Sequence, residues 1–213
     1  MKKTILALAI LLTFVNSNGC ILEQSSDLNI TWKAYKTLAK LGVKGDFTEF
    51  KYTPNAKEGK NFRELLVGST VSINTNKIDT NNKDRDETIS KMFFQKLNSP
   101  IIEGKIVDMK ADKRVSKQPR TGMLDIMITM NKQSIIIPMR YSYENEIFSA
   151  IGVIDIFDFN GKDALSTINK SCYDLHKGKT WSDVTIRFTT NIKATLCIAK
   201  IEKSKLDSEL NSE

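Results

Sequence analysis

The segment Val67–Phe94, VGSTVSINTNKIDTNNKDRDETISKMFF, contains the clearest structural signals of the 213-residue chain. It begins with an alternating segment in which Val71 and Ile73 point to one side and polar residues point to the other. This alternation is typical of a strand with one buried face. After an Asn- and Asp-rich turn, the pattern predicts a short helix that ends on Phe93 and Phe94. Two aromatic side chains at a helix end favour packing against a sheet, so we expect this helix to act as a lid.

The two-residue alternation recurs through the rest of the chain. Strands are expected over residues 28–36, 101–109, 124–130, 135–143, 147–159 and 184–196, and helices over 62–66, 85–94 and 162–175. Gly42–Gly45 is expected to form a turn or bulge, and Asn131-Lys132 a tight turn. Many short strands interrupted by a few helices favour a mainly β fold, an antiparallel eight-stranded barrel with one or two short helices. No internal repeat or domain boundary interrupts residues 20–200, and residues 201–213 form a charged tail.

Residues 1–19 predict a secretory signal peptide. Two lysines precede the apolar run 5–15, which is too short to span a bilayer as a helix. Ser17 and Gly19 are small residues at the cleavage positions before Cys20. The mature protein is therefore expected to be exported and periplasmic. Acylation of Cys20 as a lipoprotein, or a cytoplasmic protein with an apolar amino-terminal helix, are the alternatives.

The charge of the chain does not identify a partner. Removal of the two signal-peptide lysines lowers the formal net charge from +7 to +5. This excess favours anionic partners only weakly. Nucleic-acid binding needs a clustered basic stripe with aromatic residues, and the lysines here are scattered, so we expect no nucleic-acid partner.

Three cysteines, Cys20, Cys172 and Cys197, allow one disulfide in an oxidising compartment. The first and last strands of a closed barrel are neighbours, which favours a Cys20–Cys197 disulfide. Such a disulfide closes nearly the whole mature chain into one loop and stabilises it by a few kcal/mol in the chain-entropy picture.

The motifs, taken in chain order, resemble those of the YceI family of bacterial secreted proteins. The block in residues 67–94 has Thr80 followed by two asparagines, then Arg85-Asp86, then the two phenylalanines. Further matching pieces, in the same order, are Trp32 and Tyr35, Gly42-Val43 with Gly45 and Phe47, Phe62 with Leu65 and Gly68, Ser99-Pro100, residues 151–159 and residues 181–184. The resemblance covers roughly residues 28–196. Gly104 departs from it, because an aromatic residue is common there.

The resemblance implies a lipocalin-like barrel around a long apolar cavity. The family is associated with binding of polyisoprenoids, including isoprenoid quinone precursors, and has no agreed catalytic activity. We therefore expect an apolar isoprenoid lipid as the ligand, with no cofactor, no metal and no enzymatic activity. A transient membrane contact and a homodimer are left open. Because Gly104 could reshape the pocket, the identity of the ligand does not follow from the resemblance.

The inward-facing side chains are the candidate ligand-binding residues. They are large and apolar: Trp32, Phe47, Val71, Ile73, Phe93, Leu124, Ile126, Ile128, Met139, Tyr141, Phe157, Phe188 and Ile192. All except Leu124 and Ile192 are predicted to contact the ligand. Flexible methionine and flat aromatic rings suit an adaptable lining, and an eight-stranded barrel has room for packed side chains or one small ligand. The same residues are what a solid core requires, and for any single one of them the core is the expected role.

Arg85 is the candidate donor for a charged head group, because its guanidinium can bind phosphate oxygens with two hydrogen bonds. Lys36 and Lys40 could assist at the same rim. The alternative for Arg85 is an ion pair with Asp84 or Asp86 that fixes the turn.

Cys172 and His176 are four residues apart on an expected helix and so share one face. This spacing suits half a metal site or an activated thiol, but also a buried thiol beside a helix-end histidine. No other His or Cys is placed to complete a metal site. The predicted function is therefore binding and carriage of an isoprenoid lipid. The alternatives are a packed-barrel stress or interaction protein that uses loops such as 114–120, and a quinone-directed enzyme that uses Cys172 and His176.

Overall fold

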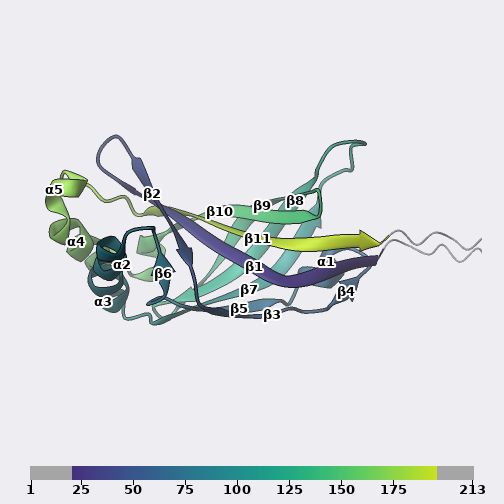
Figure 1. Ribbon diagram of the computed structural model, residues 1–213, viewed down its shortest axis with the longest axis horizontal. Helices are drawn as coiled ribbons and strands as arrows, with labels where there is room; N and C mark the ends of the chain where they lie inside the picture. Colours follow the sequence, from purple (N-terminus) through teal and green to yellow (C-terminus); the bar gives the residue numbers. More distant parts are fainter. Residues whose placement is uncertain (1–20, 196–213) are drawn as a thin grey trace, which may run out of the picture.

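A single curled antiparallel sheet forms the body of the molecule, in a computed structural model that describes residues 21–195 (Figure 1). Its strands are β1 (Ile21–Lys36), β2 (Leu41–Phe47), β3 (Phe50–Thr53), β4 (Glu58–Gly59), β5 (Thr70–Asn74), β6 (Ile78–Asp79), β7 (Ile101–Ala111), β8 (Arg120–Met130), β9 (Gln133–Glu144), β10 (Ile147–Asp155) and β11 (Asp183–Thr195). The helices are α1 (Phe62–Leu66), α2 (Lys83–Ile89), α3 (Gln95–Leu97), α4 (Lys162–Ser171) and α5 (Tyr173–His176). A π-helical turn, Ser90–Phe94, joins α2 to α3, and a 3-10 turn, Ile156–Phe159, follows β10.

The order of the strands in the sheet is β3-β5-β7-β8-β9-β10-β11-β1-β2-β6, with β4 paired to β1. Only Thr48 and Glu49 separate β2, near one end of this order, from β3 at the other. One bent stretch of chain therefore contributes β3 at one margin of the curled sheet and β2, next to β6, near the other. The structure confirms the mainly β, antiparallel, lipocalin-like fold. It has eleven strands where eight were expected, because this bend divides one stretch into β2 and β3 and because β4 and β6 are two-residue strands.

Tight turns with left-handed residues connect β8 to β9 and β9 to β10. Asn131 and Lys132, between β8 and β9, have φ angles of 48° and 61°, which confirms the expected turn. Asn145 and Glu146, between β9 and β10, have φ angles of 49° and 64°. Two successive residues with positive φ twist in the same sense as the strands, and asparagine tolerates this conformation better than most residues.

The expected turn at Gly42–Gly45 is wrong, because these residues belong to β2. The chain reverses before them, at residues 37–40, where Thr37 and Lys40 take positive φ. Gly45 instead allows a close approach: a Cβ atom there would lie 2.4 Å from Cζ2 of Trp32. A glycine within a strand can therefore mark a packing site as well as a turn.

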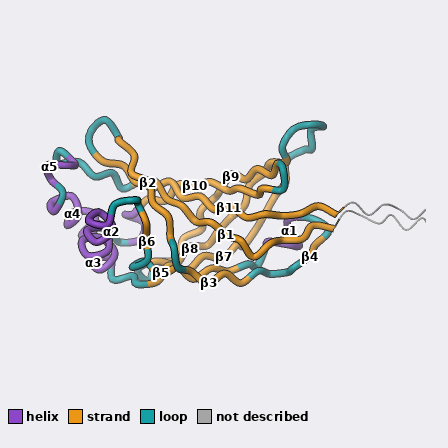
Figure 2. Tube along the Cα trace, viewed as in Figure 1, coloured by secondary structure: helices purple, strands orange, loops and turns teal. Residues whose placement is uncertain are grey.

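The helices gather at the two ends of the barrel. α2, α3, α4 and α5 lie at one end, and α1 lies at the other, beside the start of β1 and the end of β11 (Figures 1 and 2). The side chain of Asn82 begins α2 by accepting a hydrogen bond from the N–H of Arg85 at 2.9 Å. Residues 83–97, which we call the lid, end in Phe93 and Phe94, and the Phe94 ring lies 6.2 Å from that of Phe47 on β2. The expected lid is confirmed.

The α1 end of the barrel is filled with aromatic side chains. Phe62, on α1, is buried, and its ring lies 4.9 Å from Tyr143 and 5.4 Å from Phe148. Tyr141 stacks on Phe148 at 5.2 Å. These four residues define what we call the packed end, and they leave no room there for a ligand.

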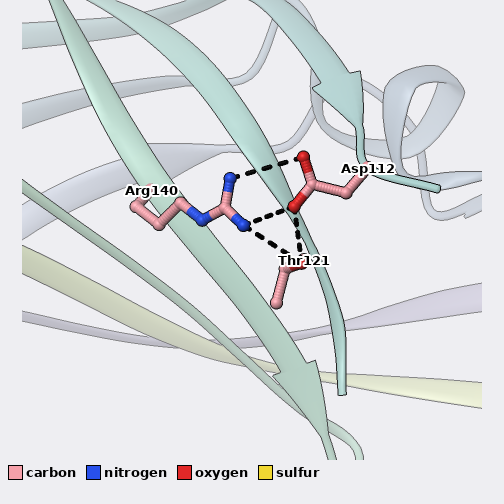
Figure 3. A network of polar contacts seen from close by, with 3 residues as sticks. All are labelled: Asp112, Thr121 and Arg140. Carbon is pink, nitrogen blue, oxygen red and sulfur yellow. Dashed lines mark hydrogen bonds and ion pairs between the residues drawn. The ribbon is translucent and has the colours of Figure 1, made fainter. Parts of the chain in front are cut away.

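An exposed polar network joins β7, β8 and β9 on the outer surface (Figure 3). Asp112 forms an ion pair with Arg140 and accepts a hydrogen bond from the hydroxyl of Thr121 at 2.6 Å. These contacts, the Thr121 hydrogen bond first, lower the pKa of Asp112. The network holds the base of the 112–119 loop to its neighbours.

Several sequence predictions concern residues outside those that the structure describes. These are the signal peptide over residues 1–19, the Cys20–Cys197 disulfide and the tail over 201–213. Between residues 21 and 195, no helix is long and apolar enough to cross a bilayer.

Candidate ligand-binding site

A cavity of about 560 Å³ lies between the inner face of the sheet and the helices at the lid end. Ligand-binding cavities typically measure roughly 300–1,000 Å³. Residues from β1, β5, β7, β8, β11, the lid and α4 line this one, and most of them are apolar. Phe188 lies at its boundary with the packed end, since it lines the cavity and also stacks on Phe148 at 6.1 Å. The barrel is therefore solid on one side of this ring and hollow on the other.

Most of the predicted ligand-binding residues line this cavity. Ten of the twelve do so: Trp32, Phe47, Val71, Ile73, Arg85, Phe93, Ile126, Ile128, Met139 and Phe188. They come from separate strands and the lid, and the curl of the sheet brings them together. Gly104 also lines the cavity, opposite Val71 and Ile126, so the position noted as unusual in sequence does shape the pocket.

Phe157, which was expected to face inward and contact the ligand, does not line the cavity. β10 ends at Asp155, whose carboxylate accepts a hydrogen bond from the N–H of Phe157 at 2.9 Å and starts a 3-10 turn. The alternation of the strand stops there, and the Phe157 side chain is 52% exposed on the outer surface. The expected strand over 147–159 is four residues too long for the same reason.

Tyr141, the other predicted ligand-binding residue outside the lining, does face inward. Its side chain is fully buried against Phe62 and Phe148 in the packed end and does not line the cavity. Leu124 and Ile192 are likewise buried inside the barrel without lining the cavity. These three side chains are core rather than binding surface.

Sequence reasoning missed the part of the lining that α4, α5 and the residue between them contribute. Leu165, Ile168, Cys172 and Leu175 line the cavity. Their spacing of three, four and three residues is that of an apolar helical stripe, and this signal could have identified them. Applying the strand alternation alone led to a list dominated by sheet residues.

Arg85 lies at the cavity wall and makes its hydrogen bonds to Thr80. Its Nε donates to the Thr80 hydroxyl at 2.8 Å, and its Nη2 donates to the Thr80 carbonyl at 2.6 Å. Asp86 accepts hydrogen bonds from the N–H and hydroxyl of Thr80 at 2.9 and 2.5 Å. Thr80 therefore stands between the two charges, and within residues 21–195 the alternative ion pair of Arg85 with Asp84 or Asp86 does not form. The Nη1 group of Arg85 is left available to a ligand.

The two assisting lysines have different positions. Lys36 lines the cavity. Lys40 instead forms an ion pair with Asp183 at 2.8 Å and lies over the ring of Trp181. Of the predicted pair, only Lys36 is thus placed beside the cavity.

Trp32 carries a buried hydrogen-bond donor without a partner in residues 21–195. The side chain is buried and lines the cavity. Its indole N–H has no hydrogen-bond partner among the residues that the structure describes. A buried donor without a partner costs free energy, and an acceptor atom on a bound ligand would remove that cost.

Cys172 and His176 both line the cavity, but their chemistry does not fit an activated pair. Burial raises the pKa of the Cys172 thiol, although nearby Lys36 lowers it. Burial and Lys36 lower the pKa of His176, whose Nδ1 lies 2.6 Å from the Thr180 hydroxyl. A reactive cysteine needs a lowered pKa. Within residues 21–195, no group of three or more His, Cys, Asp or Glu residues is arranged to hold a metal ion.

A curled antiparallel sheet with a helical lid and a large apolar cavity defines a lipocalin-like barrel protein. Within that class, the chain belongs to the family described as YceI-like domain, which matches residues 21–194. The family match spans the whole of the sheet and both groups of helices.

The solved structures to which this chain is similar are distant in sequence. A polyisoprenoid-binding domain from Saccharophagus degradans, implicated in plant cell wall breakdown, has a TM-score of 0.53 at 9% identity and covers 82% of this chain and 98% of its own. BcnA of Burkholderia cenocepacia has a TM-score of 0.46 at 12% identity, covering 78% and 96%. The Campylobacter jejuni YCEI protein has a TM-score of 0.48 at 17% identity, covering 72% and 85%. Comparison with curated proteins gave no match.

Proposed function

We propose that the protein binds an isoprenoid lipid, of the polyprenyl or quinone type, in the cavity under its lid, and carries or sequesters it. The observation that carries this proposal is the cavity of about 560 Å³ with an apolar lining. A solid barrel would have no such space. Membership of the YceI-like family and the Saccharophagus polyisoprenoid-binding domain support the choice of an isoprenoid.

Burial of the ligand's isoprenoid chain supplies the affinity in this proposal. Each methylene group transferred from water to an apolar cavity gains about 0.8 kcal/mol. A few isoprene units therefore suffice for tight binding, and no catalytic group is needed. Because the thiol of Cys172 has a raised pKa, we prefer a binding protein to a quinone-directed enzyme.

The polar end of the ligand meets two kinds of donor in this proposal. Nη1 of Arg85 would bind an anionic group such as pyrophosphate, helped by Lys36. The indole N–H of Trp32 would bind a neutral acceptor such as a quinone carbonyl. These two side chains would therefore distinguish a ligand with an anionic head group from one with a neutral head group.

We also propose that the protein acts in the periplasm after removal of residues 1–19, on the basis of the charged start, short apolar run and small residues before Cys20. The measurement is the amino-terminal mass of protein recovered from a periplasmic fraction. A mature chain that begins at residue 20 supports export, and an intact chain in the cytoplasm contradicts it.

The decisive experiment is mass spectrometry of organic extracts from protein purified without denaturant. A stoichiometric polyprenyl or quinone species would identify the ligand. An empty extract, together with no binding of added farnesyl, polyprenyl or quinone compounds, would contradict the proposal and favour an interaction protein.

Two variants then separate the head-group donors. Arg85→Ala is expected to weaken binding of a prenyl pyrophosphate at least tenfold, since charge-assisted hydrogen bonds contribute about 1.5–3 kcal/mol, and to leave a neutral quinone unaffected. Trp32→Phe keeps an aromatic ring and removes only the donor, so it should weaken the quinone and spare the pyrophosphate. Titration calorimetry with both ligands measures each variant. Equal losses for both ligands would contradict the assignment of Arg85 to the head group.

A further inference from the structure

Two segments that are distant in sequence form one surface at the lid end of the barrel. The hairpin over residues 33–44 lies against residues 170–183. Trp181 donates its backbone N–H to the carbonyl of Tyr35 at 3.0 Å and its indole N–H to the carbonyl of Thr37 at 2.8 Å. Figure 1 shows the loop after β1 and helix α5 projecting at this same end. We call this surface the hairpin–α5 face.

The hairpin–α5 face exposes large apolar side chains. Leu38 and Leu41 in the hairpin are 81% and 55% exposed, and Tyr173 and Leu175 in α5 are 62% and 68% exposed. Leu175 also lines the cavity. Apolar surface therefore continues from the outside of the protein into the proposed ligand site, and exposed apolar clusters mark sites of contact with a partner or a membrane.

The same face carries most of the net positive charge of the described chain. Its two segments, residues 33–44 and 170–183, contain seven lysines and two aspartates. All other residues between 21 and 195 together contain 20 basic and 19 acidic side chains. One of the two aspartates, Asp183, is already paired with Lys40. The face thus combines exposed apolar side chains with an excess of lysines.

We infer that the hairpin–α5 face docks on the surface of an anionic lipid bilayer. Lysines beside a membrane bind anionic head groups, and interleaved apolar side chains enter the boundary between head groups and acyl chains. Lysine suits this position because its alkyl stem lies along apolar surface while its charge stays in water. Docking here would bring Leu175, where the exposed apolar surface meets the cavity, to the acyl chains. The inference rests on the proposed function, since it supplies the route by which a lipid enters the cavity.

A second basic segment provides the comparison. The loop over residues 112–119 and the adjoining Arg120 are basic, but the only large apolar side chain exposed in them is Val115. Figure 1 shows this loop, between β7 and β8, at the opposite end of the long axis. It is remote from the lining residues of α5. If positive charge alone caused membrane binding, this loop would contribute as much as the hairpin–α5 face.

The test is co-sedimentation of the protein with ligand-free vesicles of phosphatidylcholine alone or mixed with phosphatidylglycerol. The double variant Lys44→Gln/Lys177→Gln changes Lys44, which lies on β2, and Lys177, which has a positive φ of 48°. Lys110→Gln/Lys117→Gln is the matched control near the other end, with Lys117 at a φ of 61°. Within residues 21–195 none of the four forms an ion pair. A second pair is Leu38→Ser and its control, Val115→Ser.

We expect the protein to bind the phosphatidylglycerol vesicles, and to bind less in high salt. Lys44→Gln/Lys177→Gln should weaken this binding at least tenfold, Leu38→Ser should also weaken it, and both controls should leave it unchanged. Equal binding to both kinds of vesicle, no binding to either, or an equal loss in the control variants would overturn the inference. Binding of soluble prenyl compounds without vesicles is measured separately. Its failure would contradict the proposed function instead.

Discussion

The same sheet surrounds both ends of the barrel, but the interior is filled with side chains at one end and hollow at the other. At the packed end, Phe62 from α1 enters the barrel and meets Tyr141 and Phe148, both fully buried. At the lid end, Ile126 and Ile128 of β8 also face inward in alternation, but they border a cavity. The strand pattern is identical on both sides. What differs is whether a helix inserts bulky side chains or only covers the opening.

This difference shows that inward-facing and ligand-binding are separate properties. Stability is expected to reside mainly in the packed end, where each ring has partners on all sides. The lid end is expected to tolerate changes of volume, because its side chains already border empty space. The variants below test this division in order of expected effect.

Phe148→Ala should have the largest effect on stability. The side chain is fully buried and its ring contacts those of Phe62, Tyr141 and Phe188. Its loss leaves a cavity that the neighbouring rings cannot fill, and we expect the free energy of unfolding to fall by about 3–5 kcal/mol. Denaturant titration followed by circular dichroism measures it.

Phe157→Ala is the control for that substitution. It removes the same group from a side chain that is 52% exposed, so the expected cost is below about 1 kcal/mol. A cost for Phe157→Ala as large as that for Phe148→Ala would contradict the view that the loss at Phe148 comes from its packing inside the barrel.

Much of the fold follows from the alternation of apolar residues. Along residues 184–192, the inward set predicts β11 and includes Val184, Ile186 and Phe188, which line the cavity, although Arg187 from the opposite set lines it as well. The same rule cannot tell Tyr141 from Met139, two residues apart on β9 and both buried. Only the insertion of Phe62, which is distant in sequence, makes one core and the other lining. This information lies in tertiary contacts rather than in the local pattern.

The errors at element ends have local causes that sequence patterns describe poorly. Asp155 stops β10 by capping the next turn with its carboxylate. Thr37 and Lys40 take positive φ without a glycine, while Gly42 and Gly45 lie inside β2. The sequence pattern predicts a turn at these glycines, but Gly45 lies where the Trp32 ring leaves no space for a Cβ atom. A glycine in a turn and a glycine at a close contact therefore look the same in the sequence.

A pair of glycine substitutions tests the two ends at matched positions. Gly122 and Gly104 are both buried on neighbouring strands. A Cβ atom at Gly122 would lie 2.2 Å from the Lys110 carbonyl and 2.5 Å from Cε1 of Tyr141, so the backbone must move. Gly122→Ala should therefore destabilise the protein by about 1–3 kcal/mol.

Gly104→Ala should be close to neutral. The added methyl group would lie 3.0 Å from Val71 and 3.4 Å from Ile126, and both side chains can move into the cavity. The smaller conformational entropy of the unfolded chain stabilises by about 0.4–1 kcal/mol, so the net change is expected within about 0.5 kcal/mol. Thermal unfolding of both variants measures the difference. A larger loss for Gly104→Ala than for Gly122→Ala would reverse the assignment of the two ends.

Alkaline pH should weaken the packed end selectively, with the smallest effect of the set. Burial raises the pKa of Tyr141 above its ordinary value of 10.0, and the charge of Asp112 adds to the shift. The neutral ring is favoured in the folded state, so the stabilisation is complete below pH 10 and is lost as the pH rises through the raised pKa. We expect Tyr141→Phe to unfold with a shallower loss of free energy above pH 10 than the unmodified protein. Tyr173→Phe, at an exposed site, should keep the original slope. An unchanged slope in Tyr141→Phe would contradict this prediction. It would mean that the Tyr141 ring ionises as readily inside the barrel as in the unfolded chain. Full burial beside Phe62 and Phe148 disfavours the charged form of the ring.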